Sequence, residues 1–147
     1  MNDAHRTFLS PGEQAEFSKT ITADDIDMFS KISGDCDPVH VDEAYAAKTA
    51  FGRRIAHGAL VMGLSSTTAS IISHRSVERG ATGTPVSAGY DRIRFVRPVF
   101  IGDTLTARYV VEEVDDETAR TRSRVEITNQ DGAVCLVGTH ILVWVNT

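Results

Sequence analysis

The chain has 147 residues, of which 41% are hydrophobic and 24% charged, and its formal net charge is −5. This composition is typical of one folded domain over residues 1–147 and excludes a long disordered tail. An acidic chain without a run of Lys and Arg binds phosphate backbones weakly, so no nucleic-acid partner is expected. The longest nearly apolar run, Ile141–Val145, is too short to cross a membrane.

The first part of the chain favours a strand and then a helix. The segment Glu13–Ile21 predicts a short edge strand. Thr22 precedes Asp25 by three residues, which is the spacing of a helix capping box. Hydrophobic residues at helical spacing then predict a helix over Ala23–Ser33, and Gly34 is placed to end it.

The next segment, Asp35–His40, is expected to be a fixed loop. Pro38 disfavours helix at the residue before it and has no backbone donor. Asp42 can cap a further helical turn through residues 43–48. Phe51–Arg54 then forms a connector.

The most apolar long segment runs from Ile55 to about His74 and predicts a long helix that is buried on most sides. Its many Ala, Gly, Ser and Thr residues would let other backbone approach closely. Gly63 within it lowers helix stability by roughly 1 kcal/mol relative to Ala, which indicates tight packing at that point.

After a turn-like segment at Arg79–Pro85, the hydrophobic period changes to two, as in half-buried antiparallel strands. Strands and turns are expected at these places: strands over Val86–Val96, Leu105–Glu112, Arg124–Thr128 and Val134–Val145, and turns at 115–117 and 130–132. Helices followed by about four strands predict an α+β fold, with the long helix packed on one face of the sheet.

Asp35 and His40 are the most distinctive pair of polar residues. They lie five residues apart in a segment stiffened by Pro38. A carboxylate and an imidazole held together can bind one water and move its protons in both directions. At such spacing the commoner arrangement is a turn-capping Asp beside a surface His, because both residue types are frequent in loops.

Gly58 follows His57 where the long helix is expected to begin. A helix N-terminus has unpaired N–H groups and partial positive charge, which suit a developing oxyanion, and glycine lets a ligand approach that backbone. A glycine that only relieves crowding is the simpler alternative. His57 is expected to be structural, and Ser65 and Ser66 to return hydrogen bonds to the helix. Without a Gly-x-Ser-x-Gly elbow around them, a serine hydrolase is disfavoured.

Neither the cysteines nor the histidines show the spacing of a metal site, so no metal is expected. The first residues, MNDAHRTFLSPGEQ, lack the apolar region of a signal peptide, and we therefore expect a cytoplasmic protein. Cys36 and Cys135 would be free thiols in that reducing compartment. Cys36 lies between two acids and would be a poor nucleophile.

Three arginines, Arg92, Arg94 and Arg97, recur in and just after the first long strand. A solvated strand face is the default interpretation of such a pattern. The alternative is a basic rim that receives an anionic substrate tail.

The segment SGDCDPVHVDEAYAAKTAFGRRIAHGALVMGLSS, residues 33–66, resembles the signature of the MaoC-like dehydratases, the (R)-specific enoyl-CoA hydratases. That family's pattern is an Asp, four intervening residues and a His, then an acidic residue, an Ala-rich turn, a Phe-Gly connector and a His-Gly helix entry. RFVRPVFIGDTL, residues 94–105, resembles the family's second marker. The resemblance covers about Phe17–Val145.

The resemblance implies a hot-dog fold, in which a curved antiparallel sheet wraps a long central helix, and a homodimer or dimer of dimers. It implies that Asp35 and His40 form a catalytic dyad, that the Gly58 N–H stabilises an oxyanion, and that Ser66 supports the dyad by hydrogen bonding. The implied reaction is reversible hydration of a trans-2-enoyl-CoA to a (3R)-3-hydroxyacyl-CoA, with no metal or redox cofactor. Asp37 departs from the family pattern, since many relatives carry Asn before the motif proline.

The same fold also serves acyl-CoA thioesterases, 3-hydroxyacyl-acyl-carrier-protein dehydratases and non-catalytic partner subunits, and the fold alone does not choose among them. An intact Asp35 and His40 pair favours an enzyme over a partner subunit. The expected partners are therefore an acyl-CoA substrate and further copies of the chain, with no membrane.

Overall fold

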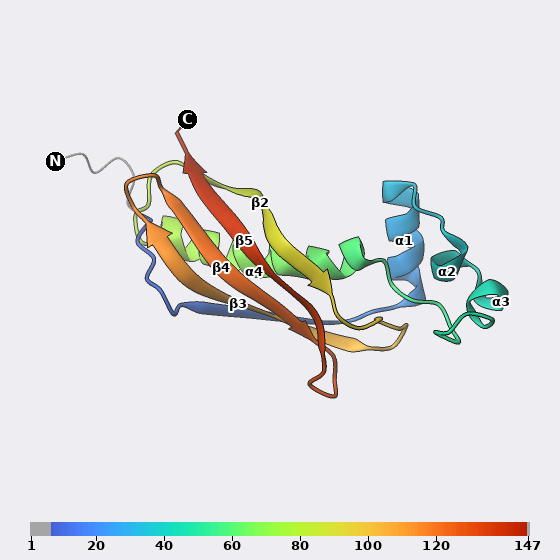
Figure 1. The fold of residues 1–147 in the computed structure, drawn as a ribbon. Coiled ribbons are helices and arrows are strands. Elements are labelled where there is room, and N and C mark those ends of the chain that lie inside the picture. The colour runs from blue at the N-terminus through green and yellow to red at the C-terminus, as the bar shows by residue number, and fades with distance from the viewer. Residues whose placement is uncertain (1–6, 147) are drawn as a thin grey trace.

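The computed structural model describes residues 7–146, which form a sheet layer, a long helix against it and a smaller helical region at one end (Figure 1). The strands are all antiparallel and lie in the order β1-β3-β4-β5-β2. Their bounds are β1 Gln14–Thr20, β2 Thr84–Phe95, β3 Thr104–Asp115, β4 Arg120–Thr128 and β5 Val134–Val145. The helices are α1 Ala23–Ser33, α2 Pro38–Val41, α3 Glu43–Ala46 and α4 Gly58–Glu78.

The central strands β3 and β4 build the core face of the sheet by alternation. Every second side chain of β4 from Thr121 to Ile127 is buried, as the predicted period of two requires. Ala107 of β3 lies opposite Ile127, and Tyr109 opposite Val125, and all four are fully buried. The sheet therefore presents a continuous apolar face, and α4 packs on it.

The N-terminal predictions are confirmed in detail. The Thr22 side chain accepts a hydrogen bond from the Asp25 N–H, and the Asp25 carboxylate accepts one from the Thr22 N–H, which completes the capping box of α1. Gly34 ends this helix with a φ of 82°, a left-handed conformation that favours glycine. β1 lies at the edge of the sheet, as predicted.

The prediction of a loop over Asp35–His40 is wrong in its second half. Pro38 occupies the first turn of α2, where a missing N–H costs nothing. The Asp37 side chain caps this turn by accepting a hydrogen bond from the Val39 N–H at 3.1 Å. Asp42 caps α3 through the Tyr45 N–H, as predicted.

The long helix exists, but α4 begins at Gly58 and ends at Glu78, later at both ends than the apolar run from Ile55 to about His74 predicts. Its start agrees with the helix entry expected at His57 and Gly58. The residues before it are not helical because their backbone N–H groups donate hydrogen bonds to carbonyls of distant segments. The Ile55 N–H donates to the Val39 carbonyl at 3.3 Å and the Ala56 N–H to the Val99 carbonyl at 2.8 Å.

One face of α4 is also open, which corrects the prediction of burial on most sides. Exposed residues recur every three or four positions along one face: Ala59, Gly63, Ser66, Ser70, His74 and Val77, with Ile71 and Glu78 exposed beside them. A Cβ added at Gly63 would meet no atom within 4 Å in the described chain, so the tight packing expected there is absent within one copy. None of the helices in residues 7–146 is long and apolar enough to cross a membrane.

Candidate active site

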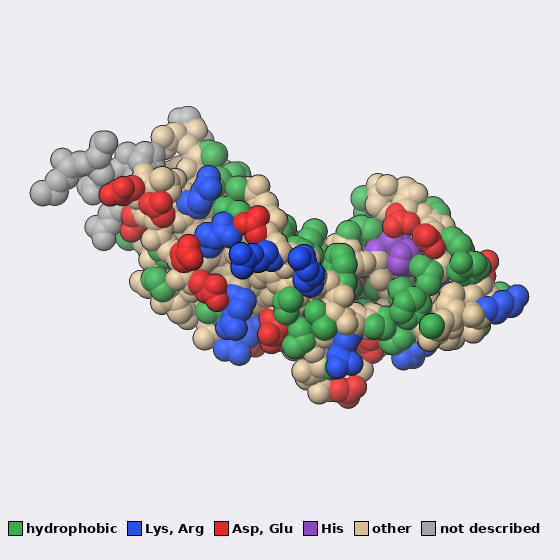
Figure 2. All heavy atoms as spheres, in the orientation of Figure 1, with side chains coloured by type: hydrophobic (Ala, Val, Ile, Leu, Met, Phe, Trp, Pro, Cys, Tyr) green, Lys and Arg blue, Asp and Glu red, His purple; other side chains and the backbone are tan. Residues whose placement is uncertain are grey.

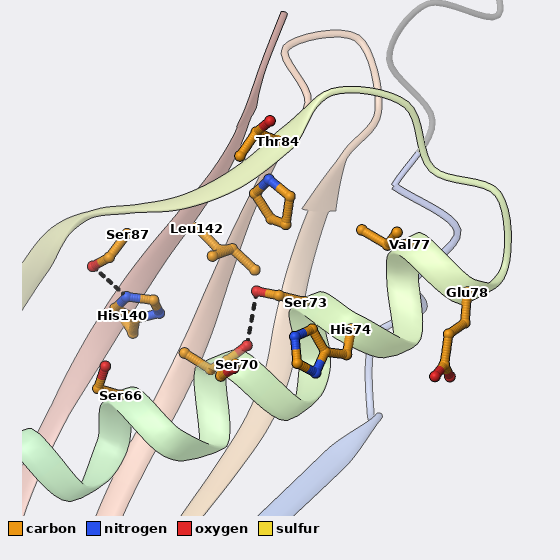
Figure 3. A pocket seen from close by; sticks show the side chains of 12 residues that line it. Ser66, Ser70, Ser73, His74, Val77, Glu78, Thr84, Ser87, His140 and Leu142 are labelled. Carbon is orange, nitrogen blue, oxygen red and sulfur yellow. Dashed lines mark hydrogen bonds between the residues drawn. The ribbon is translucent and has the colours of Figure 1, made fainter. Parts of the chain in front are cut away.

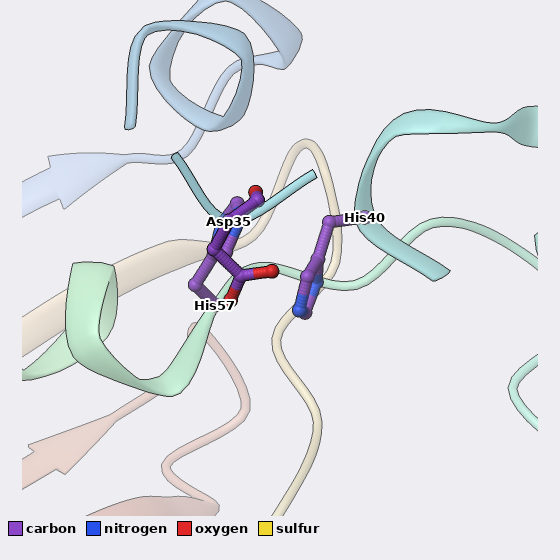
Figure 4. A group of neighbouring side chains, drawn as sticks. All are labelled: Asp35, His40 and His57. Carbon is purple, nitrogen blue, oxygen red and sulfur yellow. The ribbon is translucent and has the colours of Figure 1, made fainter. Parts of the chain in front are cut away.

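Three side chains from three different segments meet beyond the N-terminal end of α4 (Figure 4). Asp35 follows α1, His40 lies on α2, and His57 immediately precedes α4. One carboxylate oxygen of Asp35 and one ring nitrogen from each histidine lie within 4.8 Å of one another. The predicted pair is therefore brought together, and a third residue joins it.

His40 is held so that one ring nitrogen stays available. Its Nδ1 lies 2.7 Å from the Ile55 carbonyl oxygen, which can only accept, so Nδ1 carries the hydrogen. In the neutral ring Nε2 then has the free lone pair that a general base needs. Arg54 steadies the same turn, since its guanidinium donates to the His40 carbonyl and pairs with Asp27.

The Asp35 carboxylate closes a short local turn and remains exposed. It accepts a hydrogen bond from the Asp37 N–H at 3.1 Å. Two polar atoms up to 4.8 Å apart can both reach one water at about 2.8 Å from each. The separation between Asp35 and His40 thus suits a shared water.

Asp37, the departure from the family pattern, has its own structural task. Its carboxylate is the cap of α2 described above, and Asn is an equally good cap. The exchange of Asn for Asp at this position is therefore compatible with the same backbone path.

His57 is 2% exposed, and its contacts go to both members of the pair. Its ring stacks on that of His40, with centroids 3.9 Å apart and an interplanar angle of 27°. Its Nε2 lies 3.0 Å from the Asp35 carbonyl oxygen. The sequence indicated only a structural histidine here, because the partners come from segments 17 and 22 residues away and leave no local signal.

Gly58 lies at the N-terminus of α4 and shares a hollow of about 330 Å³ with His40. The walls are largely apolar and include Phe51, Val61 and Phe95. A Cβ at position 58 would lie 2.7 Å from the Phe95 ring, so this ring can pack directly over the backbone only because the residue is glycine. An N–H at a helix N-terminus, facing an apolar hollow, can stabilise negative charge on a bound oxygen.

The thiol in this hollow is a poor nucleophile. Cys135 is buried, and burial raises the pKa of its thiol. The thiolate, which is the reactive form, is thereby disfavoured. The described cysteines are free, as predicted.

Ser66 lies elsewhere, on the exposed face of α4, where it lines a larger hollow of about 510 Å³ (Figure 3). Its predicted hydrogen bond to the dyad has no counterpart within the described chain. His140 also lines this hollow, but both its ring nitrogens are occupied: Nε2 by Ser87 and Nδ1 by the Tyr109 hydroxyl, each at 2.7 Å. Burial lowers the pKa of His140 to about 4 and raises that of Tyr109 to about 12.

Asp35, His40 and His57 have both the number and the proximity of a possible metal-ligand set, since one ligand atom of each lies within 4.8 Å of the others. Two of their ring nitrogens, Nδ1 of His40 and Nε2 of His57, already contact backbone carbonyls. The absence of a metal therefore stays a prediction.

Charge is unevenly distributed around the site. Lys and Arg gather on the outer face of the sheet, and a histidine surface appears at the other end, beside carboxylates and hydrophobic side chains (Figure 2). Arg122 and Arg124 on β4 pair with Asp91 and Glu112. Arg97, at the rim of the smaller hollow, is exposed and has no carboxylate partner among residues 7–146.

Comparisons with known proteins agree with this description. The family profile described as MaoC like domain matches residues 7–133. An (R)-specific enoyl-CoA hydratase of Aeromonas caviae is 31% identical over 134 residues, which are 91% of this chain and 94% of that protein. A 3-hydroxybutyryl-CoA dehydratase of Methylorubrum extorquens is 34% identical over 135 residues, 92% of this chain and 76% of that protein.

Two solved structures share the fold. An (R)-hydratase from A. caviae involved in PHA biosynthesis has a TM-score of 0.79 at 29% identity, over 95% of this chain and 100% of that one. An unliganded R-hydratase from Pseudomonas aeruginosa has a TM-score of 0.77 at 31% identity, over 99% and 88% of the two chains. The predicted hot-dog fold is thus confirmed, and the chain belongs to the MaoC-like dehydratase family.

Proposed function

We propose that the protein catalyses the reversible hydration of a trans-2-enoyl-CoA to a (3R)-3-hydroxyacyl-CoA. The observation that carries this proposal is the placement of Asp35 and His40 at one-water separation, with His40 lining a largely apolar hollow that also contains the Gly58 helix terminus. The names of the relatives, (R)-specific enoyl-CoA hydratase and 3-hydroxybutyryl-CoA dehydratase, support it.

In the proposed mechanism, Asp35 and His40 hold one water. The free Nε2 of His40 takes a proton from this water as its oxygen bonds to C3 of the substrate. The electron pair of the C2–C3 double bond moves toward the thioester carbonyl. The dyad then returns a proton to C2, so that water is added across the double bond without any external reactant.

The developing negative charge falls on the thioester oxygen. We assign its stabilisation to the Gly58 N–H, at the positive end of a helix of 21 residues. Phe95 covers this backbone but is 59% exposed, so its ring has room to move when substrate enters. The thioester itself accepts the electrons, and no metal or redox cofactor is required. We therefore expect the protein to keep its activity after dialysis against a chelator. A loss of activity that added zinc reverses would contradict this expectation.

We further propose a homodimer or a dimer of dimers. β2 is an edge of the sheet and leaves its outer backbone groups unpaired by any other described strand. The open face of α4, with Gly63 and Ser66, offers a second surface at which small residues would let another copy approach. In that assembly the Ser66 of one copy would be free to reach the dyad of the other. Light scattering that shows only monomer at micromolar concentration would refute this assembly.

The proposed reaction is best tested against its closest competitor, an acyl-CoA thioesterase. Enoyl-CoA esters of increasing chain length are mixed with the protein, and enoyl absorbance and free thiol are measured in the same samples. The hydratase consumes absorbance without releasing thiol, whereas a thioesterase releases thiol in step with substrate loss. Enoyl thioesters of acyl carrier protein, tested in parallel, identify the carrier.

We also propose that the protein acts in the cytoplasm. Its described cysteines are free thiols, as is usual in that reducing compartment.

A further inference from the structure

The His57 ring contacts two other aromatic rings, one of which belongs to the catalytic pair. The His40 ring is stacked on it, with centroids 3.9 Å apart, and the Phe29 ring of α1 is tilted by 52° to it, with centroids 4.7 Å apart. The His57 residue is 2% exposed, so its ring is held by packing. His40, in turn, has its ring plane supported by His57 and its Nδ1 held by the Ile55 carbonyl.

The hydrogen bonds of His57 reach the other member of the pair. Nε2 lies 3.0 Å from the Asp35 carbonyl oxygen, which only accepts, so Nε2 carries the hydrogen. The Ser30 hydroxyl is also within reach, at 3.2 Å. This contact ties the backbone of Asp35 to the start of α4, although Asp35 itself lies in an exposed segment without regular structure.

A histidine is a costly choice for packing alone at this position. Its Nδ1 is buried and has no hydrogen-bond partner among residues 7–146. A buried polar atom without a partner destabilises the fold, and an apolar ring would avoid that cost. The residue is therefore better explained by what its Nε2–H and its ring face do for Asp35 and His40.

We propose that His57 is a positioning residue for the reaction: its Nε2–H fixes the Asp35 backbone while its ring face fixes the imidazole of His40. This inference rests on the proposed function and assigns no contact with substrate to His57. A displacement of about 1 Å in a catalytic group can cost on the order of a hundredfold in rate, so a residue that holds two such groups should affect kcat strongly.

Two variants separate the two contacts. His57→Phe keeps a flat ring for stacking but removes the donor, and His57→Gln keeps a donor near the position of Nε2 but removes the ring. We expect each to lower kcat for crotonyl-CoA about tenfold or more, with KM within threefold of wild type. If both variants fold and retain kcat within threefold of wild type, His57 is not a positioning residue.

Phe29→Leu is the matched control, because the Phe29 ring contacts His57, whereas its link to Asp35 through the Ser33 hydroxyl uses the Phe29 backbone carbonyl, which the substitution keeps. We expect it to lower the melting temperature while kcat stays within threefold. A loss of kcat equal to that of His57→Phe would mean that packing alone explains the effect. In a His40→Gln background, His57→Gln should lower kcat by less than a further threefold, and a full additional loss would also overturn the proposal.

A measurement without substrate keeps this test independent of the proposed function. The ring ¹⁵N resonances of His40 report which nitrogen carries the hydrogen. We expect the Nδ1–H form in the wild type and a mixture with the Nε2–H form in His57→Gln; an unchanged His40 spectrum there would overturn the proposal. A wild type that hydrates no enoyl-CoA would refute the proposed function and leave this result standing.

Discussion

Two hollows formed by residues 7–146 can be compared through one histidine in each: His140 in the larger hollow, which also contains the exposed His74, and His40 in the smaller one. The two rings differ in how many of their nitrogens are free to bind another molecule. In the larger one, both ring nitrogens of His140 are bonded to Ser87 and Tyr109, and burial lowers its pKa to about 4. In the smaller one, His40 uses only Nδ1 and keeps Nε2 for another molecule. The larger hollow therefore contains a histidine whose two ring nitrogens are both bonded, and the smaller one contains a histidine with one nitrogen free for another molecule. Of these two histidines, only His40 can act as a general base without first breaking a hydrogen bond of the fold.

The largest effect is expected from the dyad. Asp35→Asn and His40→Gln should each lower the hydration rate on the order of a hundredfold or more, because each removes a general acid–base group. The double variant should lose little more, as for residues that act as a unit. Turnover of crotonyl-CoA measures both. His140→Gln is the matched control from the other hollow and should stay within threefold of wild type; an equal loss there would erase the contrast between the two sites.

Gly58→Val tests the helix terminus in the smaller hollow. Valine keeps the backbone N–H, but its side chain should prevent the thioester oxygen from reaching it. Loss of one oxyanion donor costs about 2.7–4 kcal/mol in well-studied enzymes, so we expect a fall in turnover on the order of a hundredfold in a variant that still folds. The new side chain would also displace Phe95. We therefore expect Phe95→Ala to leave the defect of Gly58→Val in place, and a rescued rate in the combined variant would attribute it to the displaced ring.

His140 is expected to govern stability rather than turnover. Its folded-state pKa of about 4 lies below the ordinary value of 6.5, so the unfolded chain binds more protons between these two values. The contribution of His140 to the free energy of unfolding is therefore fully present above pH 6.5. It is lost as the pH drops toward 4, which lowers that free energy by up to about 3 kcal/mol. Urea unfolding across this range measures the effect. His140→Gln should flatten the curve, and an unchanged curve would show that other groups control it.

The smallest effect concerns Arg97 at the rim of the smaller hollow. If its charge receives the phosphates of CoA, Arg97→Ala should raise KM for crotonyl-CoA about threefold to fivefold at low salt, the range of an exposed ion pair. KM for the N-acetylcysteamine thioester, which has no phosphate, should not change. Arg124→Ala, on the outer face of the sheet, is the control and should alter neither value. An equal rise in KM for both thioesters would show that Arg97 does not bind the phosphates of CoA.

Much of this architecture follows from the sequence, and the failures have local causes. The strands were predictable because period two in β3 and β4 reports a one-sided core. The apolar run alone places the start of α4 too early, because Ile55 and Ala56 continue it while their N–H groups bond to distant carbonyls; the His57-Gly58 pair places it correctly. The loop prediction fails at Pro38 because a capped first helical turn also suits proline.

The site residues divide in the same way, into those with a local signal in the sequence and those whose role depends on distant contacts. Asp35, His40 and Gly58 lie within one motif, and their grouping was predicted from it. The role of His57 depends on Phe29, Ser30 and Asp35, which become its neighbours only when α1 and the segment after it fold back on α4. The Ser66 prediction remains a prediction, since a second copy of the chain would have to complete it.

Both histidines of the site are oriented by main-chain carbonyls, those of Ile55 and Asp35. A carbonyl is present whatever side chain its residue carries, so no single substitution deletes the acceptor. The tautomers that the chemistry needs therefore depend on the path of the backbone, which supplies the acceptors, and on the ring contact between His57 and His40, which keeps the imidazole facing its acceptor. In a mutational scan, position 55 should tolerate exchange among hydrophobic residues of similar size, while insertions or deletions between positions 51 and 57 should abolish activity.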